Sequence, residues 1–172
     1  MKCPNPHFFS FDGGDITCDG GVILLRSADK KLGLCERLSK ILKDPRDPSR
    51  VEHSLLTMLK QRIFGIALGY EDLNDHDRLR KDPGIQSSVD QEKELASTST
   101  LWRMEQNADR EAIIKGHKLL FDIFIQSFAK APKEIGLDFD ATDDLVHGQQ
   151  DGAHYNGYYN KYCFLPLYVY CG

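Results

Sequence analysis

The spacing of apolar side chains changes at Pro132, and this change constrains the fold of the chain more than any other feature. Before Pro132, apolar residues recur every three or four positions, which predicts amphipathic helices. After it, residues 135–142 alternate between apolar and polar side chains, as a half-buried strand does. A further run, 158–170, is rich in Tyr, Phe, Leu and Val and is typical of strands. The pattern predicts an α+β protein, with an all-helical domain over 1–132 followed by antiparallel strands over 133–172.

Proline, glycine and capping residues predict where the first helices begin and end. These helices are expected over residues 21–32, 34–42 and 49–69. Two prolines within 44–50 separate the second helix from the third. Ser49 and Glu52 have the spacing of a capping box, so the third helix is expected to begin there. Pro83 is expected to end a polar helix or turn, which leaves 84–96 as a loop.

Two further helices are predicted before Pro132. The first contains Trp102, which is expected in the core, and a Ser/Thr cluster over 97–100 offers several caps for it. The second runs over 109–130, and its apolar positions form one stripe: Ile113, Leu120, Phe124 and Phe128, widened by Ile114, Phe121 and Ile125. At the start of the chain, three phenylalanines (Phe8, Phe9 and Phe11) have the pattern of an extended arm.

Composition excludes several classes of protein. The 172 residues are 41% hydrophobic and 28% charged, which is too apolar for a disordered chain. No apolar run reaches the roughly 18 residues that a membrane span needs, so no membrane association is expected. The N-terminus lacks the long apolar stretch of a secretory signal. The five cysteines include no CxxC pair, which argues against a zinc ribbon and fits free thiols in a reducing cytoplasm.

Charge is distributed unevenly along the chain. The net charge is −4, and residues 135–172 account for it with five acids against one base. A protein whose whole surface binds nucleic acid is usually basic, so charge alone makes such binding a minority expectation here. Residues 36–62 nevertheless have seven bases against four acids. The candidates for phosphate contacts are Arg46, Arg50, Lys60, Arg62, Arg78, Arg80, Lys81 and Arg103.

The segment LDFDATDD, residues 137–144, is the strongest candidate for chemistry. Asp138 and Asp140 are two positions apart on a predicted strand, so both project from one face. Carboxylates are hard oxygen ligands that suit Mg²⁺ or Mn²⁺, and such ions favour phosphoryl transfer. The alternative is that Asp138 is a surface strand residue and that Asp143 and Asp144 are solvated turn residues.

The chain also resembles a known family, the DDE-type insertion-sequence transposases with a DDE domain of group 1. The resemblance covers about residues 10–172, in blocks that keep the family's order. The blocks are DGGVILLRSADKKLGL (19–34), DPRDPSRVEHSLLTMLKQRIFGIALGYEDLNDHDRLRKDP (44–83), LASTSTLWRMEQ (95–106), LDFDATDDLVHGQQDGAHYNGYY (137–159) and YCFLPLYVYCG (162–172). Blocks of this length are far more specific than a short motif.

This resemblance implies a ribonuclease-H-like catalytic domain whose first strands are residues 133–172. Asp140, which precedes Ala141 and Thr142, matches the first of three metal-binding carboxylates, and Asp138 is the reserve candidate. The complete enzyme would use Mg²⁺ or Mn²⁺ to cleave phosphodiesters and transfer strands. The family's second Asp and its Glu are expected beyond Gly172. The chain is therefore expected to be the N-terminal portion of such an enzyme, inactive by itself and binding no metal.

The resemblance also implies partners. The helical domain would bind DNA at the terminal inverted repeats of the element, and would form homo-oligomers or mixed oligomers with intact transposase. A non-enzymatic alternative is a DNA-binding remnant that represses intact transposase. A rival enzyme class is the haloacid-dehalogenase-like phosphatase, whose DxDxT motif matches residues 138–142, with Asp138 as nucleophile and Asp140 as general acid/base. Only thirty residues follow Thr142, which is short for the parallel α/β body of that class.

Overall fold

The computed structural model describes residue 14 and residues 16–171, and it mixes helices with small antiparallel sheets. The α+β class is thereby confirmed. The chain divides into two compact units, residues 1–127 and residues 128–172, and each is described by itself. The predicted arm with Phe8, Phe9 and Phe11 lies outside the described residues.

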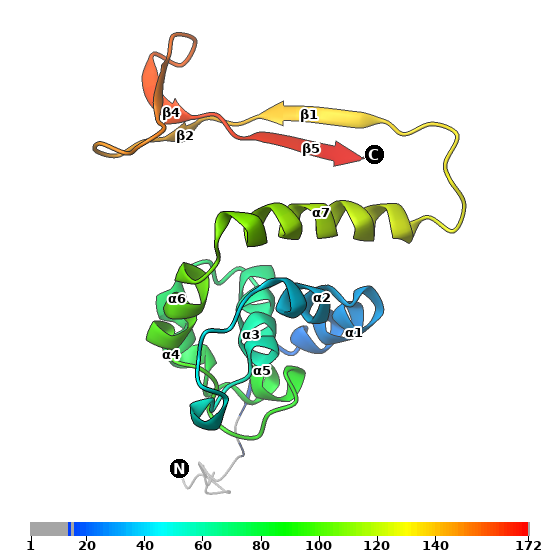
Figure 1. The fold of residues 1–172 in the computed structure, drawn as a ribbon, viewed down its shortest axis with the longest axis vertical. Helices are drawn as coiled ribbons and strands as arrows, with labels where there is room; N and C mark the ends of the chain where they lie inside the picture. The colour runs from blue at the N-terminus through cyan, green and yellow to red at the C-terminus, as the bar shows by residue number, and fades with distance from the viewer. Residues whose placement is uncertain (1–13, 15, 172) are drawn as a thin grey trace, which may run out of the picture. The chain divides into compact units, whose positions relative to one another are not determined.

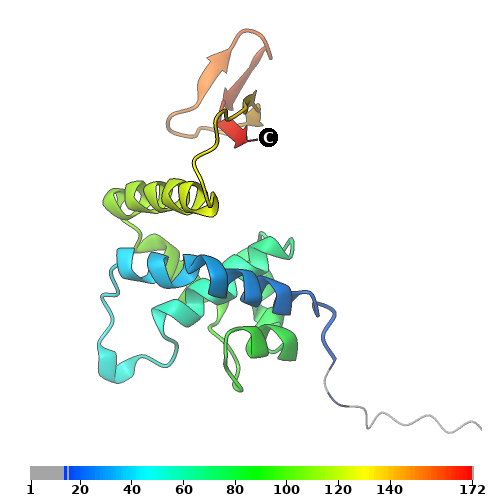
Figure 2. The same cartoon turned by 90° about the vertical axis from the view of Figure 1, so that its right-hand side faces the viewer.

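The first unit is helical (Figures 1 and 2). Its elements are α1 (Val22–Leu32), α2 (Leu34–Ile41), the 3₁₀ turn η1 (Pro48–Arg50), α3 (Leu55–Ala67), the 3₁₀ turn η2 (Leu73–Asp75), α4 (His76–Leu79), α5 (Pro83–Ser88), α6 (Thr98–Gln106) and α7 (Arg110–Ser127). The central helix is α3, which contacts α1, α2 and α6. Within the described part of the chain, no helix combines the length and the apolar character that a membrane span requires.

The predicted capping box at Ser49 and Glu52 is wrong. Ser49 lies inside η1, where the side chain of Asp47 accepts a hydrogen bond from its backbone N–H at 3.0 Å. The helix begins later, because Ser54 accepts a hydrogen bond from the Thr57 backbone N–H at 3.1 Å. The end near Gly69 is confirmed: Gly69 has a φ of +96°, the left-handed region that favours glycine in this position.

Pro83 begins a helix instead of ending one. It occupies the first turn of α5, and the Asp82 side chain caps this helix by accepting from the Ile85 backbone N–H at 3.0 Å. Proline is tolerated there because the first N–H groups of a helix have no intrahelical partner. The segment 84–96 is therefore not simply a loop, since it includes most of α5.

Two groups of buried side chains form the core of the helical unit. The first joins α1, α2, α3 and α5 through Val22, Cys35, Phe64, Leu79, Ile85, Val89 and Leu95. The second joins α3 to α6 through Met58, Leu59, Ala96, Leu101 and Met104. Trp102 was expected in this core, but its side chain is exposed, because Leu101 and Met104 occupy the face of α6 that packs against α3.

Helix α7 packs through a narrower face than its sequence suggests. Its buried residues are Ala112 and Leu119, and it contacts α2. Much of the predicted stripe is exposed instead, including Ile113, Leu120 and Phe121. The helix thus has two apolar faces, of which only the one with Ala112 and Leu119 is covered within its own unit.

The second unit is built from strands. They are β1 (Leu137–Ala141), β2 (Asp144–Leu145), β3 (His154–Asn156), β4 (Lys161–Phe164) and β5 (Leu167–Cys171). The strand run predicted over 158–170 is divided between β4 and β5 at Pro166, which cannot donate to a ladder. The two antiparallel sheets have the orders β1-β5 and β2-β4-β3.

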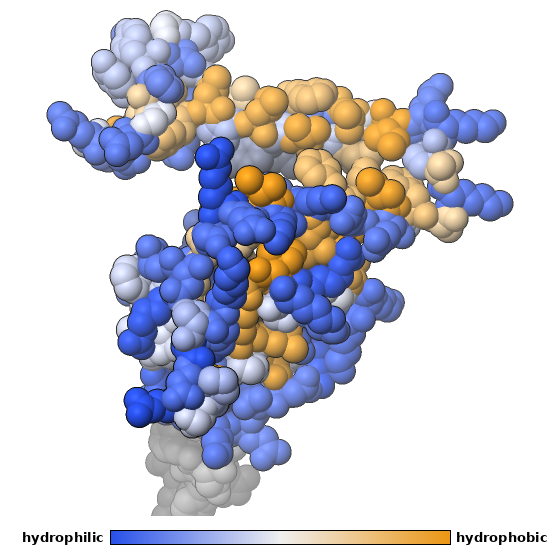
Figure 3. Space-filling view, viewed as in Figure 1, coloured by the Kyte–Doolittle hydropathy of each residue, from blue (hydrophilic) through white to orange (hydrophobic). Residues whose placement is uncertain are grey.

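The register of β1 and β5 assigns each side chain to a face of this two-stranded ribbon. Asp138 pairs with Tyr170 and Asp140 with Tyr168, so these four residues share one face. The other face is apolar, with pairs Leu137–Cys171, Phe139–Val169 and Ala141–Leu167. Apolar residues gather along the ribbon in Figure 3. Strands β1 and β5 are exposed throughout the described residues, on both faces.

Candidate functional site

The first candidate site is the acidic face of the β1-β5 ribbon. Asp138 and Asp140 lie on β1 and are exposed to solvent. Neither carboxylate has a hydrogen-bond or ion-pair partner among residues 14 and 16–171. Each lies directly across the ladder from a tyrosine of β5, which places two carboxylates and two phenol rings on a common surface. Both acids are therefore free to bind a cation or a donor from outside the described chain.

The donor set of this face fits part of a magnesium site. Mg²⁺ commonly takes one or two protein carboxylates and fills its other positions with water and substrate phosphates. Asp138 and Asp140 supply such a pair from one strand. The described residues contain no group of three or more His, Cys, Asp or Glu side chains placed to hold a metal. The ribbon alone thus offers at most a two-carboxylate site.

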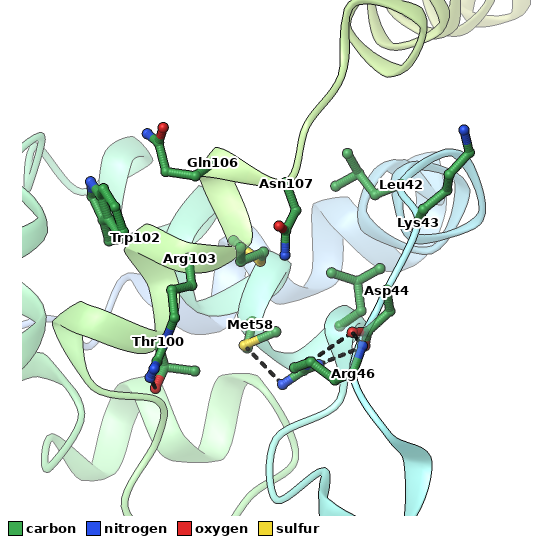
Figure 4. Close-up of a pocket in the computed structure, with 12 residues that line it drawn as sticks. Leu42, Lys43, Asp44, Arg46, Met58, Thr100, Trp102, Arg103, Gln106 and Asn107 are labelled. Atoms are coloured by element: carbon green, nitrogen blue, oxygen red, sulfur yellow. Dashed lines mark hydrogen bonds and ion pairs between the residues drawn. The ribbon is translucent and has the colours of Figure 1, made fainter.

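The second candidate site is a cavity of about 420 Å³ in the helical unit. Two bases that the sequence singled out, Arg46 and Arg103, line it together with the apolar side chains of Leu55, Met58 and Met104. Figure 4 shows the Asn107 side chain projecting from the end of α6 into the space beside Leu42 and Met58. The lining of the cavity thus combines apolar side chains with cationic groups.

Arg46 is held rigidly at this cavity. Its guanidinium donates to both carboxylate oxygens of Asp44 at 2.7 Å each, and to the Met58 sulfur at 3.8 Å (Figure 4). The hydrogen bonds from Arg46 lower the pKa of Asp44, and those to Asp44 raise the pKa of Arg46. Because Asp44 neutralises the guanidinium, Arg46 has less charge to offer to a phosphate.

Most of the other predicted phosphate-binding bases also have carboxylate partners. Arg80 pairs with Glu94, and Lys81 lies 3.8 Å from the same carboxylate. The hydrogen bond from Arg80 lowers the pKa of Glu94. The more weakly paired bases are Arg50, 3.8 Å from Asp47, and Lys60, 3.9 Å from Asp90.

Arg62 has a structural role in the helical unit. Its side chain is mostly buried and donates to Glu105 at 2.6 Å, which links α3 to α6. It also donates to the backbone carbonyls of Tyr70 at 3.3 Å and Glu71 at 2.8 Å, just beyond the end of α3. These contacts leave little of the guanidinium for an external phosphate.

Two of the predicted bases have no carboxylate partner among the described residues, and these are Arg78 and Arg103. The Arg78 guanidinium lies 5.6 Å from the centre of the Tyr70 ring, a cation–π contact. Arg103 makes a single weak hydrogen bond, to the Thr100 hydroxyl at 3.3 Å. Both guanidinium groups keep their charge available to an anion.

The structure adds residues that the sequence reasoning did not single out. Lys43 and Asn107 line the cavity with Arg46 and Arg103, from segments far apart in the chain. Tyr168 and Tyr170 join the two aspartates through strand pairing. The alternation of residues 167–171 could have indicated that both tyrosines share a face, but only the register of β1 with β5 places them beside the acids.

The described cysteines do not offer a nucleophile in either site. Cys18, Cys35, Cys163 and Cys171 are free thiols. Burial and the neighbouring Asp29 side chain raise the pKa of Cys35 to about 12, so this thiol stays protonated near neutral pH.

Comparison with known proteins identifies one family. The family model described as "Transposase DDE domain group 1" matches residues 8–172, which include both units of the structure. No curated protein and no solved structure gives a significant match to the chain.

Proposed function

The chain belongs to the transposase DDE domain group 1 family, and from this premise we propose that it acts in DNA transposition of an insertion sequence. The observation that carries the proposal is the extent of the match, residues 8–172. Cleavage and joining of phosphodiesters would be the activity of the complete protein. Its substrate, DNA, would place it in the cytoplasm.

The proposal assigns a different task to each unit. The helical domain, residues 1–132, would bind the terminal inverted repeats of the element and support homo-oligomers or mixed oligomers with intact transposase. Residues 133–172 would be the first strands of a ribonuclease-H-like catalytic domain. The antiparallel pairing of β1 with β5 is compatible with this assignment. A parallel neighbour of β1, which the phosphatase alternative predicts, is not found among the described strands.

Asp140 would be the first metal-binding carboxylate, with Asp138 beside it on the same face. When bound, Mg²⁺ or Mn²⁺ would neutralise charge on a phosphate and activate a hydroxyl or water. The two aspartates would orient the ion, and their exposure leaves room for a DNA phosphate. This chain by itself would bind the ion weakly and transfer no strands, because its described residues lack a third ligand in reach.

Arg103 and Arg78 would make the strongest phosphate contacts, because no carboxylate neutralises them within the described residues. Arg46, Arg50, Lys60, Arg80 and Lys81 would contribute less, since each has an acidic neighbour. Removal of one base that binds a phosphate should reduce the slope of log affinity against log salt by about 0.9.

A second candidate function is a non-enzymatic repressor that occupies the ends of the element. The specific observation that favours it is the absence of a three-ligand metal cluster among the described residues. Both candidates require binding to the element's ends, but only the first requires Asp140 to bind a metal.

Two measurements on the full chain test these proposals. Gel shifts with duplexes carrying the ends of the element, over a range of salt, should show a specific complex that Arg103→Gln weakens and Arg80→Gln changes much less. Calorimetric titration with Mn²⁺ should show weak binding that Asp140→Asn abolishes. A shift without metal binding would favour the repressor. The transposase proposal would be rejected if neither the shift nor the metal binding were observed.

A further inference from the structure

The aspartate face of the β1-β5 ribbon is also an aromatic face. Strand pairing puts Tyr168 opposite Asp140 and Tyr170 opposite Asp138. Directly opposed residues in an antiparallel pair have Cβ atoms about 4.5–5.5 Å apart, within easy reach of a phenol side chain. Any group held at the two carboxylates is therefore next to the two rings.

The two rings form an ordered pair. Their centroids are 6.5 Å apart with an interplanar angle of 27°, so they are arranged as a stacked pair along β5. Their residues are 48% and 56% exposed, and neither hydroxyl has a hydrogen-bond partner among residues 14 and 16–171. Both the ring surfaces and the hydroxyl groups are thus available to a ligand.

The composition of the other face of the ribbon suits core packing, and that of this face does not. Leu137, Phe139 and Val169 form a face without charges, which is the face suited to burial against another element. The tyrosine face has two carboxylates, and burying them without partners would be costly. This face is therefore suited to contact with solvent or substrate, and its stacked pair of exposed rings packs against no core among the described residues.

We propose that Tyr168 and Tyr170 bind an unpaired DNA base by stacking, beside the phosphate held at Asp140 and Asp138. The inference deepens the proposed function and rests on it. Stacking of a base on an aromatic side chain is worth about 1–3 kcal/mol and tolerates any base. A backbone phosphate would bind through the metal on the carboxylates, and the neighbouring base would lie on the rings. The pair would favour DNA with a single-stranded end over blunt duplex.

The experiment measures binding of the full chain to fluorescein-labelled DNA by anisotropy, with Ca²⁺ present. One probe is a blunt duplex, and the other is the same duplex with a four-nucleotide single-stranded overhang. Tyr168→Leu removes the ring and keeps an apolar strand residue, while Tyr168→Phe keeps the ring. Tyr158→Leu is the matched control, because Tyr158 is 89% exposed in the same unit but lies outside β1 and β5.

Tyr168→Leu is expected to weaken binding of the overhang probe by about 5- to 100-fold, with little change for the blunt duplex. Tyr168→Phe should bind nearly as well as the natural chain, and Tyr158→Leu should be unchanged. The inference is overturned if Tyr168→Leu binds both probes normally, or weakens binding of both equally.

Arg103→Gln distinguishes failure of the tyrosine site from failure of the proposed DNA-binding function. If Arg103→Gln weakens binding of both probes while Tyr168→Leu changes neither, the tyrosine site fails and the DNA-binding function remains. Absence of binding by the natural chain to both probes would overturn both.

Discussion

Gln61 is the polar centre of the helical unit. It is fully buried, and its amide makes a pair of hydrogen bonds with the backbone of Ala96: Nε2 donates to the carbonyl at 2.9 Å and Oε1 accepts from the N–H at 3.1 Å. This pair fixes the segment before α6 against α3, and α6 supplies one wall of the cavity. Gln61 Nε2 also lies 3.3 Å from His76 Nδ1.

His76 is buried beside this amide in its neutral form. Its Nε2 has no hydrogen-bond partner among the described residues. Burial, together with the charge of Arg62, lowers the pKa of His76 from 6.5 to about 4, although Asp75 and Glu105 oppose the change. Protonation would place an unpaired charge inside the core, so the folded state resists it.

The stability of the helical unit should therefore fall in acid. Above pH 6.5 the histidine is neutral in both the folded and the unfolded states and contributes no pH dependence. As the pH falls from about 6.5 to about 4, the unfolded chain binds a proton that the folded chain does not, and stability is lost. The free energy of unfolding should fall by on the order of 3 kcal/mol across this range from His76 alone.

Urea unfolding followed by the helical circular dichroism signal at several pH values would measure this effect. His76→Gln should flatten the dependence between pH 6.5 and pH 4.5 relative to the natural chain. His117→Gln is the control, because His117 is exposed on α7 and its removal should leave the dependence unchanged. An identical acid dependence in the His76→Gln chain would contradict the assignment.

Position 65 requires glycine because its backbone lies close to the ring of the same histidine. A Cβ at this position would lie 2.9 Å from His76 Cε1 and 3.1 Å from Nε2, and the His76 ring is fully buried. Gly65→Ala should destabilise the protein by about 1–3 kcal/mol, although alanine normally stabilises a helix interior by about 1 kcal/mol. Gly116→Ala is the matched test, because its Cβ would meet only Leu38 Cδ2 at 3.7 Å. Urea midpoints should move in opposite directions, and two shifts of the same sign would contradict this account.

At the scale of single elements, α7 has two apolar faces, and only one of them packs against the rest of the helical unit. Its covered face has Ala112 and Leu119 near α2, with Gly116 close to Leu38. Small residues at 112 and 116 allow the close approach of the two helices. The side chains of Ile113 and Phe121 lie on the exposed face, so the size of an apolar side chain does not predict its burial along this helix.

A pair of adjacent leucines tests this orientation of α7. Leu119 is 4% exposed and Leu120 is 54% exposed. Leu119→Ala should cost about 2–5 kcal/mol, because it leaves a cavity against α2, and Leu120→Ala should change stability by less than about 0.5 kcal/mol. Urea unfolding of the two variants would measure both values. A larger loss for Leu120→Ala would show that the predicted stripe is the packed one.

At the scale of the whole molecule, burial is concentrated in the helical unit. Fourteen of the fifteen buried hydrophobic residues among those described belong to it, and Cys163 is the exception in the strand unit. A two-stranded ribbon without a covered face is only marginally stable in water. The apolar surface that would stabilise the strand unit is present on β1 and β5 but remains exposed.

Hydrogen exchange should therefore differ sharply between the units. Backbone amides of α3 should exchange slowly, through unfolding of the helical unit, whereas those of β1 and β5 should exchange through local opening of much lower free energy. Mass spectrometry of exchanged peptides can compare residues 55–67 with residues 137–141. Protection of the ribbon as strong as that of α3 would show that the strand unit has its own stable core.

Local sequence patterns predicted several elements well. The helix over 21–32 and the start of the next one at Leu34 agree with α1 and α2, because glycine and periodic apolar residues mark their limits directly. The strand around Asp140 and the end of α3 near Gly69 were predicted for the same reason. The capping box at Ser49 failed because Pro48 and Asp47 form a competing 3₁₀ turn whose stability depends on a side-chain contact.

The sequence by itself determined the class of the fold, the change from helix to strand, and the shared face of Asp138 and Asp140. These features follow from the backbone period of 3.6 or 2 residues, which acts over a few positions. Only tertiary structure decided that Trp102 is exposed, that Arg62 forms an ion pair with Glu105, that α7 packs through Ala112 and Leu119, and that Tyr168 lies beside Asp140. Each of these features depends on which distant segment of the chain supplies the neighbouring surface. Strand pairing between residues about thirty positions apart does not alter the local periodicity of the sequence, so the sequence pattern could not predict it.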